Sequence, residues 1–170
     1  MSQRMAALVK SLIFGSCFVW LWMIGFPRWL DLPGSANMIR NEPLRLIGIL
    51  PLLVGGMIAL ACIGAFIFIG RGTPAPFDPP KELITRGPYR YVRNPMYVGF
   101  GMVLVGEALL LANFSWQLIG YGTAMFAAVN LFIVFYEEPT LTRNFGDQYR
   151  EYRAHVGRWI PRLTPWSPHH

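Results

Sequence analysis

The stretch from Leu46 to Gly70, LIGILPLLVGGMIALACIGAFIFIG, carries no charged side chain. A hydrocarbon layer about 30 Å thick is crossed by roughly 20 helical residues, because each residue of an α-helix rises about 1.5 Å. This stretch is therefore long enough and apolar enough to cross a membrane. The whole chain has the same character, since 54% of its residues are hydrophobic and only 14% are charged. A soluble core does not need that much apolar sequence.

Three further stretches are almost as apolar, and they are Met5 to Phe26, Met96 to Ala112, and Ser115 to Tyr136. The first is long and is followed by no small-residue cleavage pattern, which favours a span over the alternative, a cleaved signal peptide. The third and fourth apolar stretches meet through Asn113-Phe114, which predicts a helical hairpin. We predict an all-α fold, a polytopic membrane protein with about four transmembrane helices, in which residues 1–170 form a single domain.

The basic residues predict the orientation, since Lys and Arg are retained on the cytoplasmic side. With four spans, most of them fall on one side, namely Arg4, Lys10, Arg71, Lys81, Arg86, Arg90, Arg93, Arg143, Arg150, Arg153, Arg158 and Arg162. Only Arg28, Arg40 and Arg45 fall on the other. We predict that both termini are cytoplasmic. The net charge of +6 then reflects orientation and attraction to anionic lipid, and no nucleic-acid motif supports nucleic acid as a partner.

Cysteine and histidine patterns indicate no metal site. Cys17 and Cys62 lie singly inside predicted spans, so neither a disulfide framework nor a C-x-x-C motif is available. The three histidines, His155, His169 and His170, make no ligand spacing with a carboxylate. Glycines at Gly99, Gly101 and Gly106 sit in an apolar helix, where small residues permit close helix packing rather than dinucleotide binding.

Two polar segments remain, and both are predicted at the cytoplasmic face. The first, Arg71 to Pro95, holds six prolines that forbid a continuous helix. It ends in LITRGPYRYVRNPMY, residues 83–97, whose aromatic rings, guanidinium groups and helix start suit a charged, ring-containing ligand. A juxtamembrane anchor at the headgroup level is the alternative interpretation.

The second polar segment starts at Glu137-Glu138-Pro139. Apolar residues then recur every three or four positions, which predicts an amphipathic C-terminal helix; they are Leu141, Phe145, Tyr149, Tyr152 and Val156. Paired carboxylates at a helix C-terminus oppose the helix dipole, so we expect a cation beside them. Arg86, Arg90 and Arg93 are candidates, and so is a cationic ligand.

Taken together, GPYRYVRNPMYVG, a helical hairpin, and EEPTLTRNFGDQYREYRAHVGRWIPR resemble the isoprenylcysteine carboxyl methyltransferase and phospholipid methyltransferase superfamily of integral membrane proteins. The resemblance covers about residues 81–162. It implies an S-adenosyl-L-methionine-dependent methyltransferase that releases S-adenosyl-L-homocysteine. The acceptor would be lipophilic, enter from the bilayer, and be methylated on a carboxylate, thiol or amine.

The resemblance also implies a cofactor-binding region at residues 81–97 and 137–162. Its residues would be Lys81, Glu82, Leu83, Ile84, Tyr89, Asn94, Pro95, Met96, Tyr97 and Glu137. Two positions depart from the pattern. Asn94 stands where the family usually has histidine, so no histidine base is available there. Ile133 stands where prenylcysteine-specific members have an arginine, so the resemblance does not extend to a farnesylcysteine-like acceptor.

Methyl transfer from a sulfonium depends mainly on alignment in a site shielded from water. Arg93 and Arg158 are our candidate catalytic residues for holding an anionic acceptor or headgroup, with Glu138 supporting them or accepting a proton from an amine. Two alternatives stay open, a non-catalytic lipid- or partner-binding protein and an NADPH-dependent sterol or isoprenoid reductase. The oligomeric state is not predicted.

Glu107 falls inside the third predicted span, about 15 Å beyond Tyr97 along the helix. An unpaired charge there costs roughly 2.5 to 3.5 kcal/mol, so the side chain should face protein. We favour a protonated packing residue with Gln117 or Asn130 as its partner. A place in the acceptor pocket is the alternative.

Overall fold

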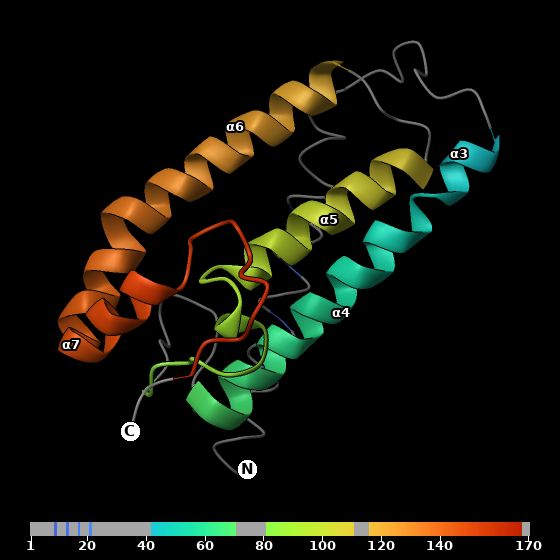
Figure 1. Ribbon diagram of the computed structural model, residues 1–170. Coiled ribbons are helices and arrows are strands. Elements are labelled where there is room, and N and C mark those ends of the chain that lie inside the picture. Colours follow the sequence, from blue (N-terminus) through green and yellow to red (C-terminus); the bar gives the residue numbers. More distant parts are fainter. Residues whose placement is uncertain are drawn as a thin grey trace.

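The computed structural model describes residues 42–70, 81–110 and 116–167, together with positions 9, 13, 17 and 21. Every regular element in those three ranges is helical, which confirms the all-α prediction. In chain order the elements are α3 (Glu42–Leu46), α4 (Ile49–Ala65), the π-helical turn η2 (Phe66–Gly70), the 3-10 turn η3 (Gly87–Arg90), α5 (Pro95–Leu110), α6 (Trp116–Phe132), the π-helical turn η4 (Ile133–Glu137) and α7 (Glu138–His155). Helices α4, α5 and α6 run along a common direction (Figure 1).

Two helices in the described residues are long and apolar enough to cross a membrane. One runs from Ile49 to Gly70 over 22 residues, and the other from Ile119 to His155 over 37 residues. The second exceeds the roughly 20 residues that a bilayer needs, and its uncharged part, residues 119–136, ends where Glu137 begins the polar sequence. We therefore place the membrane-spanning part at residues 119–136.

The prediction of four spans is not confirmed. Helix α5 has 16 residues and is about 24 Å long, which is less than the thickness of the hydrocarbon layer. The first predicted span lies outside the described ranges except for the four single positions. Helix α6 runs back opposite to α5, as expected for a hairpin, but the close packing partner of α5 is α4 (Figure 1).

Helices α4 and α5 pack through a seam of glycines. Gly48 lies opposite Gly106, and Gly55 lies opposite Gly99, so the two helices are antiparallel. Within each pair on one helix the spacing is seven residues, about two turns, which keeps both glycines on one face. A Cβ at Gly106 would lie 2.6 Å from the Leu52 backbone nitrogen and 2.7 Å from the Gly48 carbonyl oxygen. The backbones approach so closely that only glycine fits.

The end of α5 distant from the polar segments is held by an arginine. Nε and Nη2 of Arg45 donate to the carbonyl oxygen of Leu110, at 3.1 and 2.9 Å. A cation at a helix C-terminus satisfies a terminal carbonyl and complements the helix dipole. This contact fixes the register of α5 against α3 and α4.

Helix α7 confirms the predicted amphipathic helix. Tyr149, Tyr152 and the following Val156 are buried, with Leu141 and Phe145 packed against them. The helix is kinked at Gly146, whose φ of 52° is a left-handed value that favours glycine. The kink turns α7 back toward the polar loop, so the chain after it returns to the other helices (Figure 1).

Two hydrophobic clusters join the polar loop, residues 81–94, to the helices. One consists of Cys62, Ala65, Ile84 and Tyr89 and connects the loop to the end of α4. The other consists of Tyr149, Tyr152, Val156 and Trp166, with Leu83 of the loop packed against it. The loop therefore packs against α4 through one cluster and against α7 through the other.

The glycine seam predicts a position-specific effect of adding one methyl group. Gly106→Ala should lower the stability of the protein by about 1 to 3 kcal/mol, because the seam cannot open without shifting a helix backbone. Gly101→Ala is the matched control on the same helix, since no atom of a neighbouring element lies within 4 Å of the place that its added methyl group would take. Thermal unfolding of both variants in detergent measures the difference, and equal midpoints would contradict the seam.

Candidate functional site

Consecutive carboxylates at the junction of η4 and α7 face different surroundings. Neighbouring residues on a helix project about 100° apart, so Glu137 and Glu138 cannot share one environment. Glu138 is held by two guanidinium groups. Arg158 donates from Nε to Oε1 at 2.8 Å and from Nη2 to Oε2 at 3.0 Å, while Arg93 donates from Nη1 to Oε1 at 2.9 Å. The Glu138 side chain is only 8% exposed, and that of Arg93 only 10%.

These contacts determine the charge state of the cluster. Burial opposes ionisation of Glu138, but the hydrogen bond from Arg158 and the charges of Arg93, Arg158 and Arg153 outweigh it, and the pKa of the carboxyl is lowered. The same hydrogen bond raises the pKa of Arg158. Glu138 is thus a carboxylate at neutral pH, and the expectation of a cation beside the carboxylate pair is confirmed, with Arg93 and not Arg86 or Arg90 supplying it from the loop.

Glu137 lies just beyond the apolar span, and in the described residues it forms no ion pair with Arg93 or Arg158. Its side chain shares a hydrogen bond with Tyr97 at the start of α5. Oε2 of Glu137 is buried, and no group in the described residues donates a hydrogen bond to it. Burial, then the charge of Glu138, raise the pKa of Glu137 to about 7, although the hydrogen bond from Tyr97 acts in the opposite direction.

Asn94 ties the loop to the C-terminal segment, which we define as residues 156–167. Its Nδ2 donates to the carbonyl oxygen of Arg158 at 3.3 Å, and its side chain is buried. Beside it, the backbone nitrogen of Arg93 donates to the Gly157 carbonyl oxygen at 2.9 Å, and that of Arg162 donates to the Tyr91 carbonyl oxygen at 2.9 Å. An amide that donates to the backbone suits this position without any ionisable ring.

Tyr89 is fixed from two sides. Its hydroxyl shares a hydrogen bond with the thiol of Cys62, and its ring meets that of Phe66 edge-on, with centroids 6.1 Å apart. The Tyr152 hydroxyl of α7 donates to the Tyr89 carbonyl oxygen at 2.7 Å. Burial raises the pKa of the Tyr89 hydroxyl well above its usual value. The residue therefore joins α4 to α7 through the loop.

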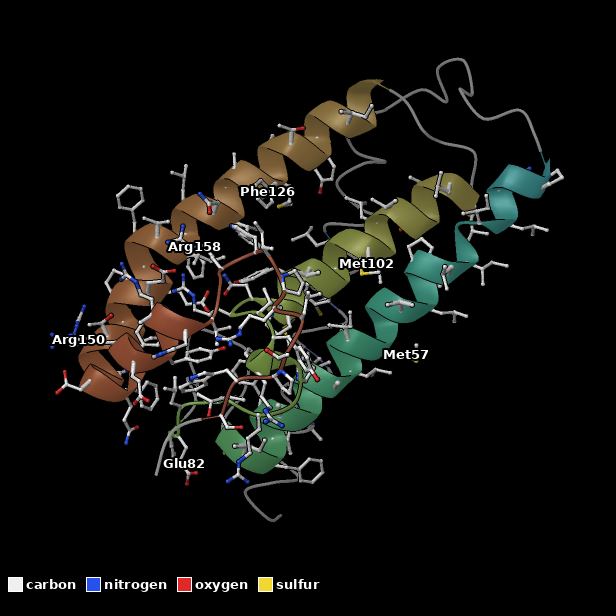
Figure 2. All side chains as sticks on the ribbon, viewed as in Figure 1. Met57, Glu82, Met102, Phe126, Arg150 and Arg158 are labelled. Carbon is white, nitrogen blue, oxygen red and sulfur yellow. The ribbon has the colours of Figure 1, made fainter. Side chains whose placement is uncertain are left out.

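The other predicted cofactor-binding residues are distributed around this centre. Pro95 is fully buried, and Met96 packs against the cluster of Cys62 and Tyr89. Leu83 and Ile84 pack inward, whereas Lys81 and Glu82 are exposed. Figure 2 shows Glu82 near one end of the molecule and Arg158 nearer its middle, between the C-terminal segment and α6. The structure therefore brings Tyr89 and Tyr97 near Glu137, places Asn94 against the C-terminal segment, and leaves Lys81 and Glu82 exposed.

Several residues of the site were not predicted from the sequence. Cys62 was considered only for a disulfide or a C-x-x-C motif, although its thiol shares a hydrogen bond with Tyr89. Trp166 is buried against Tyr152, with ring centroids 5.5 Å apart. Asn130, proposed as a partner for Glu107, instead accepts a hydrogen bond from Nε1 of Trp159 at 3.1 Å. The sequence feature that could have indicated the roles of Trp159 and Trp166 is the presence of aromatic residues in a proline-containing C-terminal tail.

The donor and acceptor atoms of this centre fit S-adenosylmethionine. That molecule offers an ammonium group and ribose hydroxyls, all of which donate hydrogen bonds. A buried carboxylate oxygen without a donor, such as Oε2 of Glu137, is the acceptor that these groups require. Trp166 Nε1 and Arg93 Nε are buried donors that likewise have no hydrogen-bond partner in the described residues.

Comparison with known proteins supplies the family. The model of the phospholipid methyltransferase family matches residues 44–148, more than half of the chain. The chain belongs to this family. Membership makes it a membrane protein, in agreement with the two candidate spans. The match covers α4, α5, α6 and most of α7, and therefore includes Asn94, Tyr97 and both carboxylates.

Individual relatives differ in what their names say they methylate. The chain is 39% identical over 79 residues to a protein-S-isoprenylcysteine O-methyltransferase of Schizosaccharomyces pombe, covering 46% of this chain and 33% of the relative. It is 32% identical over 91 residues to a phosphatidylethanolamine N-methyltransferase of Zygosaccharomyces rouxii, covering 53% and 10%. It is 34% identical over 77 residues to methanethiol S-methyltransferase 1 of Bradyrhizobium diazoefficiens, covering 43% and 24%.

The chain thus spans about a third of the first relative's length and less of the other two. No solved structure is similar enough to this chain to count as a match. The family is therefore established by sequence, and the acceptor of this chain is not.

The cluster around Glu138 predicts a contrast between two ion pairs. Glu138→Ala should destabilise the protein by about 3 to 5 kcal/mol, because the nearly buried Arg93 guanidinium loses its counter-charge and the partly exposed Arg158 guanidinium loses both of its hydrogen bonds to the carboxylate. Asp147→Ala is the control. The ion pair of Asp147 with Arg150 is exposed, so its loss should change stability by less than about 1 kcal/mol. Limited proteolysis with trypsin compares how firmly the C-terminal segment is held in the two variants. Faster cleavage after Arg158 is expected only for Glu138→Ala. Equal cleavage in both variants would show that the cluster does not hold the C-terminal segment.

Proposed function

We propose that this chain transfers a methyl group from S-adenosyl-L-methionine to a lipophilic, membrane-associated acceptor and releases S-adenosyl-L-homocysteine. The observation that carries the proposal is the buried Glu137 carboxyl, whose Oε2 has no donor in the described residues and whose hydrogen-bond partner is the aromatic residue Tyr97. Family membership supports the reaction class.

The cofactor-binding residues in this proposal are those of the centre just described. Glu137 accepts hydrogen bonds from the ammonium or the ribose hydroxyls of the cofactor, and Tyr89 and Tyr97 offer aromatic rings to its adenine. Asn94 and Pro95 set the start of α5, and Met96 and residues 81–84 complete the surroundings. The bound cofactor supplies an electrophilic methyl group, whose bond to sulfur breaks as the acceptor heteroatom bonds to carbon.

Arg93, Glu138 and Arg158 were predicted to serve the acceptor, and that assignment stays a proposal. Their mutual contacts favour a positioning role, because each guanidinium donates to Glu138 and the net charge of the three groups is positive. The cluster holds the C-terminal segment against the loop and so shields the site from water, which favours in-line displacement. Glu138 is too strongly paired to act as a general base at neutral pH.

The acceptor is proposed to be lipophilic because the site lies at the end of apolar helices. Residues 119–136 and the helix from Ile49 to Gly70 place hydrocarbon beside the start of α7. Ile133, one turn before Glu137, is 1% exposed, so this position contributes a buried apolar surface and no charge. A thiol or a neutral amine is an acceptor group compatible with such a surface. We further propose that the site and both termini lie on the cytoplasmic side, where a soluble methyl donor is available.

The first test is cofactor affinity, measured by calorimetry on the purified protein in detergent. Glu137→Gln should weaken S-adenosylmethionine binding by about tenfold, because a charge-assisted hydrogen bond is replaced by a neutral one. Tyr97→Ala should weaken it as well. Glu151→Gln, an exposed position on α7, is the matched control and should leave affinity unchanged. Unchanged binding in both site variants, or binding of NADPH in place of S-adenosylmethionine by the wild-type protein, would exclude the proposal.

The second test uses pH. A cationic ligand prefers ionised Glu137, and the pKa of that group is about 7. Affinity for S-adenosylmethionine should therefore rise as pH increases from about 6 to 8, as the carboxyl loses its proton. The ammonium of the ligand titrates as well, so Glu137→Gln is needed as the reference. The rise should be smaller in that variant, and identical pH profiles would remove Glu137 from the binding site.

A further inference from the structure

The C-terminal segment makes a turn that reaches back along α6. Trp159 donates its indole N–H to Oδ1 of Asn130 at 3.1 Å, and its ring lies against Phe126 with centroids 4.9 Å apart. Asn130 and Phe126 precede Glu137 by seven and eleven residues, which corresponds to about 10 and 16 Å along the helix. The turn therefore extends to the depth of the membrane-spanning part of α6, and Figure 1 shows it as the red loop beside that helix.

The tip of the turn presents apolar side chains to its surroundings. Ile160 follows Trp159 and is 82% exposed, although it lies level with an apolar helix. Phe126, Leu131 and Phe135 of α6 are exposed as well. At about 100° per residue, Leu131 and Phe135 project on the side of α6 away from Phe126, so apolar side chains are exposed around this helix. At the depth of the span, the surrounding medium is hydrocarbon and the exposure is favourable.

Irregular backbone is tolerated at membrane depth only where its polar groups are paired within the protein. At the two ends of this turn, one backbone group each of Gly157, Arg158 and Arg162 is paired in this way. The Gly157 carbonyl oxygen accepts from the Arg93 nitrogen, the Arg158 carbonyl oxygen accepts from Asn94, and the Arg162 nitrogen donates to Tyr91. Pro161 has no N–H to satisfy. The guanidinium of Arg158 is neutralised by Glu138.

We propose that residues 158–161 form a re-entrant wedge that inserts into the hydrocarbon layer beside α6, with lipid acyl chains as its partner and Trp159 as its attachment to Asn130. The exposure of Ile160 at the depth of an apolar helix that is itself almost wholly exposed argues for lipid. The proposal rests on the membrane location of the family and is independent of methyl transfer, so it survives if the proposed reaction is wrong.

Insertion has a consequence for the site. Arg158 immediately precedes Trp159, and its guanidinium and its carbonyl oxygen are bonded to Glu138 and Asn94. Anchoring the turn in the bilayer therefore also holds Arg158 in place. Asn130 supplies the only polar attachment of Trp159 that the described residues show, and its replacement should release the turn without changing any group that contacts Glu137.

Single-cysteine labelling in lipid nanodiscs tests the wedge. The background variant is Cys17→Ser, in which the remaining cysteine, Cys62, is fully buried. A fluorophore is attached to Ile160→Cys in this background. Phosphatidylcholine with brominated acyl chains quenches the fluorophore where it contacts the hydrocarbon layer. Leu131→Cys on α6 is the lipid-facing control, and Glu151→Cys on the exposed side of α7 is the aqueous control. Quenching at position 160 should match that at position 131 and exceed that at position 151 by about threefold or more.

The attachment is tested by adding Asn130→Leu to the Ile160→Cys protein. Quenching at position 160 should fall by about half or more as the turn leaves the bilayer, while Cys62 stays protected from thiol reagents because the fold is intact. In the proteins without Asn130→Leu, quenching at position 160 equal to that at position 151 would contradict the proposed wedge. Unchanged quenching in the Asn130→Leu protein would show that Trp159 does not hold the turn in place.

Discussion

The Glu138 carboxylate holds three separated parts of the chain together, and the site depends on it. Arg93 reaches it from the loop before α5, and Arg158 from the segment after α7, while Glu138 itself begins α7. The charges of Arg93 and Glu138 are nearly buried, and burying either one without the other would cost most of its hydration free energy. Each charge is therefore stable only when paired with the other. The cluster thus joins the loop, α7 and the C-terminal segment, and backbone hydrogen bonds between residues 91–93 and residues 157–162 join the same parts of the chain.

Glu137 and Glu138 are adjacent but have different surroundings. One short sequence therefore provides both an ion pair that holds the fold together and a carboxyl group proposed to bind the cofactor. The pKa of Glu138 is lowered by the hydrogen bond and charges of its arginines, which overcome its burial, whereas burial and the charge of Glu138 raise the pKa of Glu137 to about 7. The permanently ionised neighbour makes a second negative charge unfavourable. A cation that approaches Glu137 relieves that repulsion, so Glu138 increases the preference of its neighbour for a positively charged ligand.

Much of this site could be predicted from the sequence because its residues lie in two short motifs with recognisable order. The helical class, the short α5, the amphipathic α7 and the need for a cation beside the carboxylates follow from periodicity, length and charge. The partner of Glu138 could not be chosen in advance, because Arg86, Arg90 and Arg93 all lie within eight residues and only the fold of the loop separates them. Arg90 instead donates to the Trp166 carbonyl oxygen and to Ser167.

The number of spans and the place of Trp159 depend on tertiary contacts that no local pattern records. Composition predicts that α6 is apolar, but only the structure shows that the tail folds back to Asn130. Helices α4 and α5 are joined by backbone contact at glycines, while α6 continues into α7 and meets them at the polar end through Tyr97, Arg93 and Tyr89. In the described part of the chain, residues proposed to bind the cofactor, Tyr89, Tyr97 and Glu137, are therefore among those that connect the two halves. A ligand that bridges Tyr97 and Glu137 would strengthen that connection, which explains why residues so far apart in the sequence converge there.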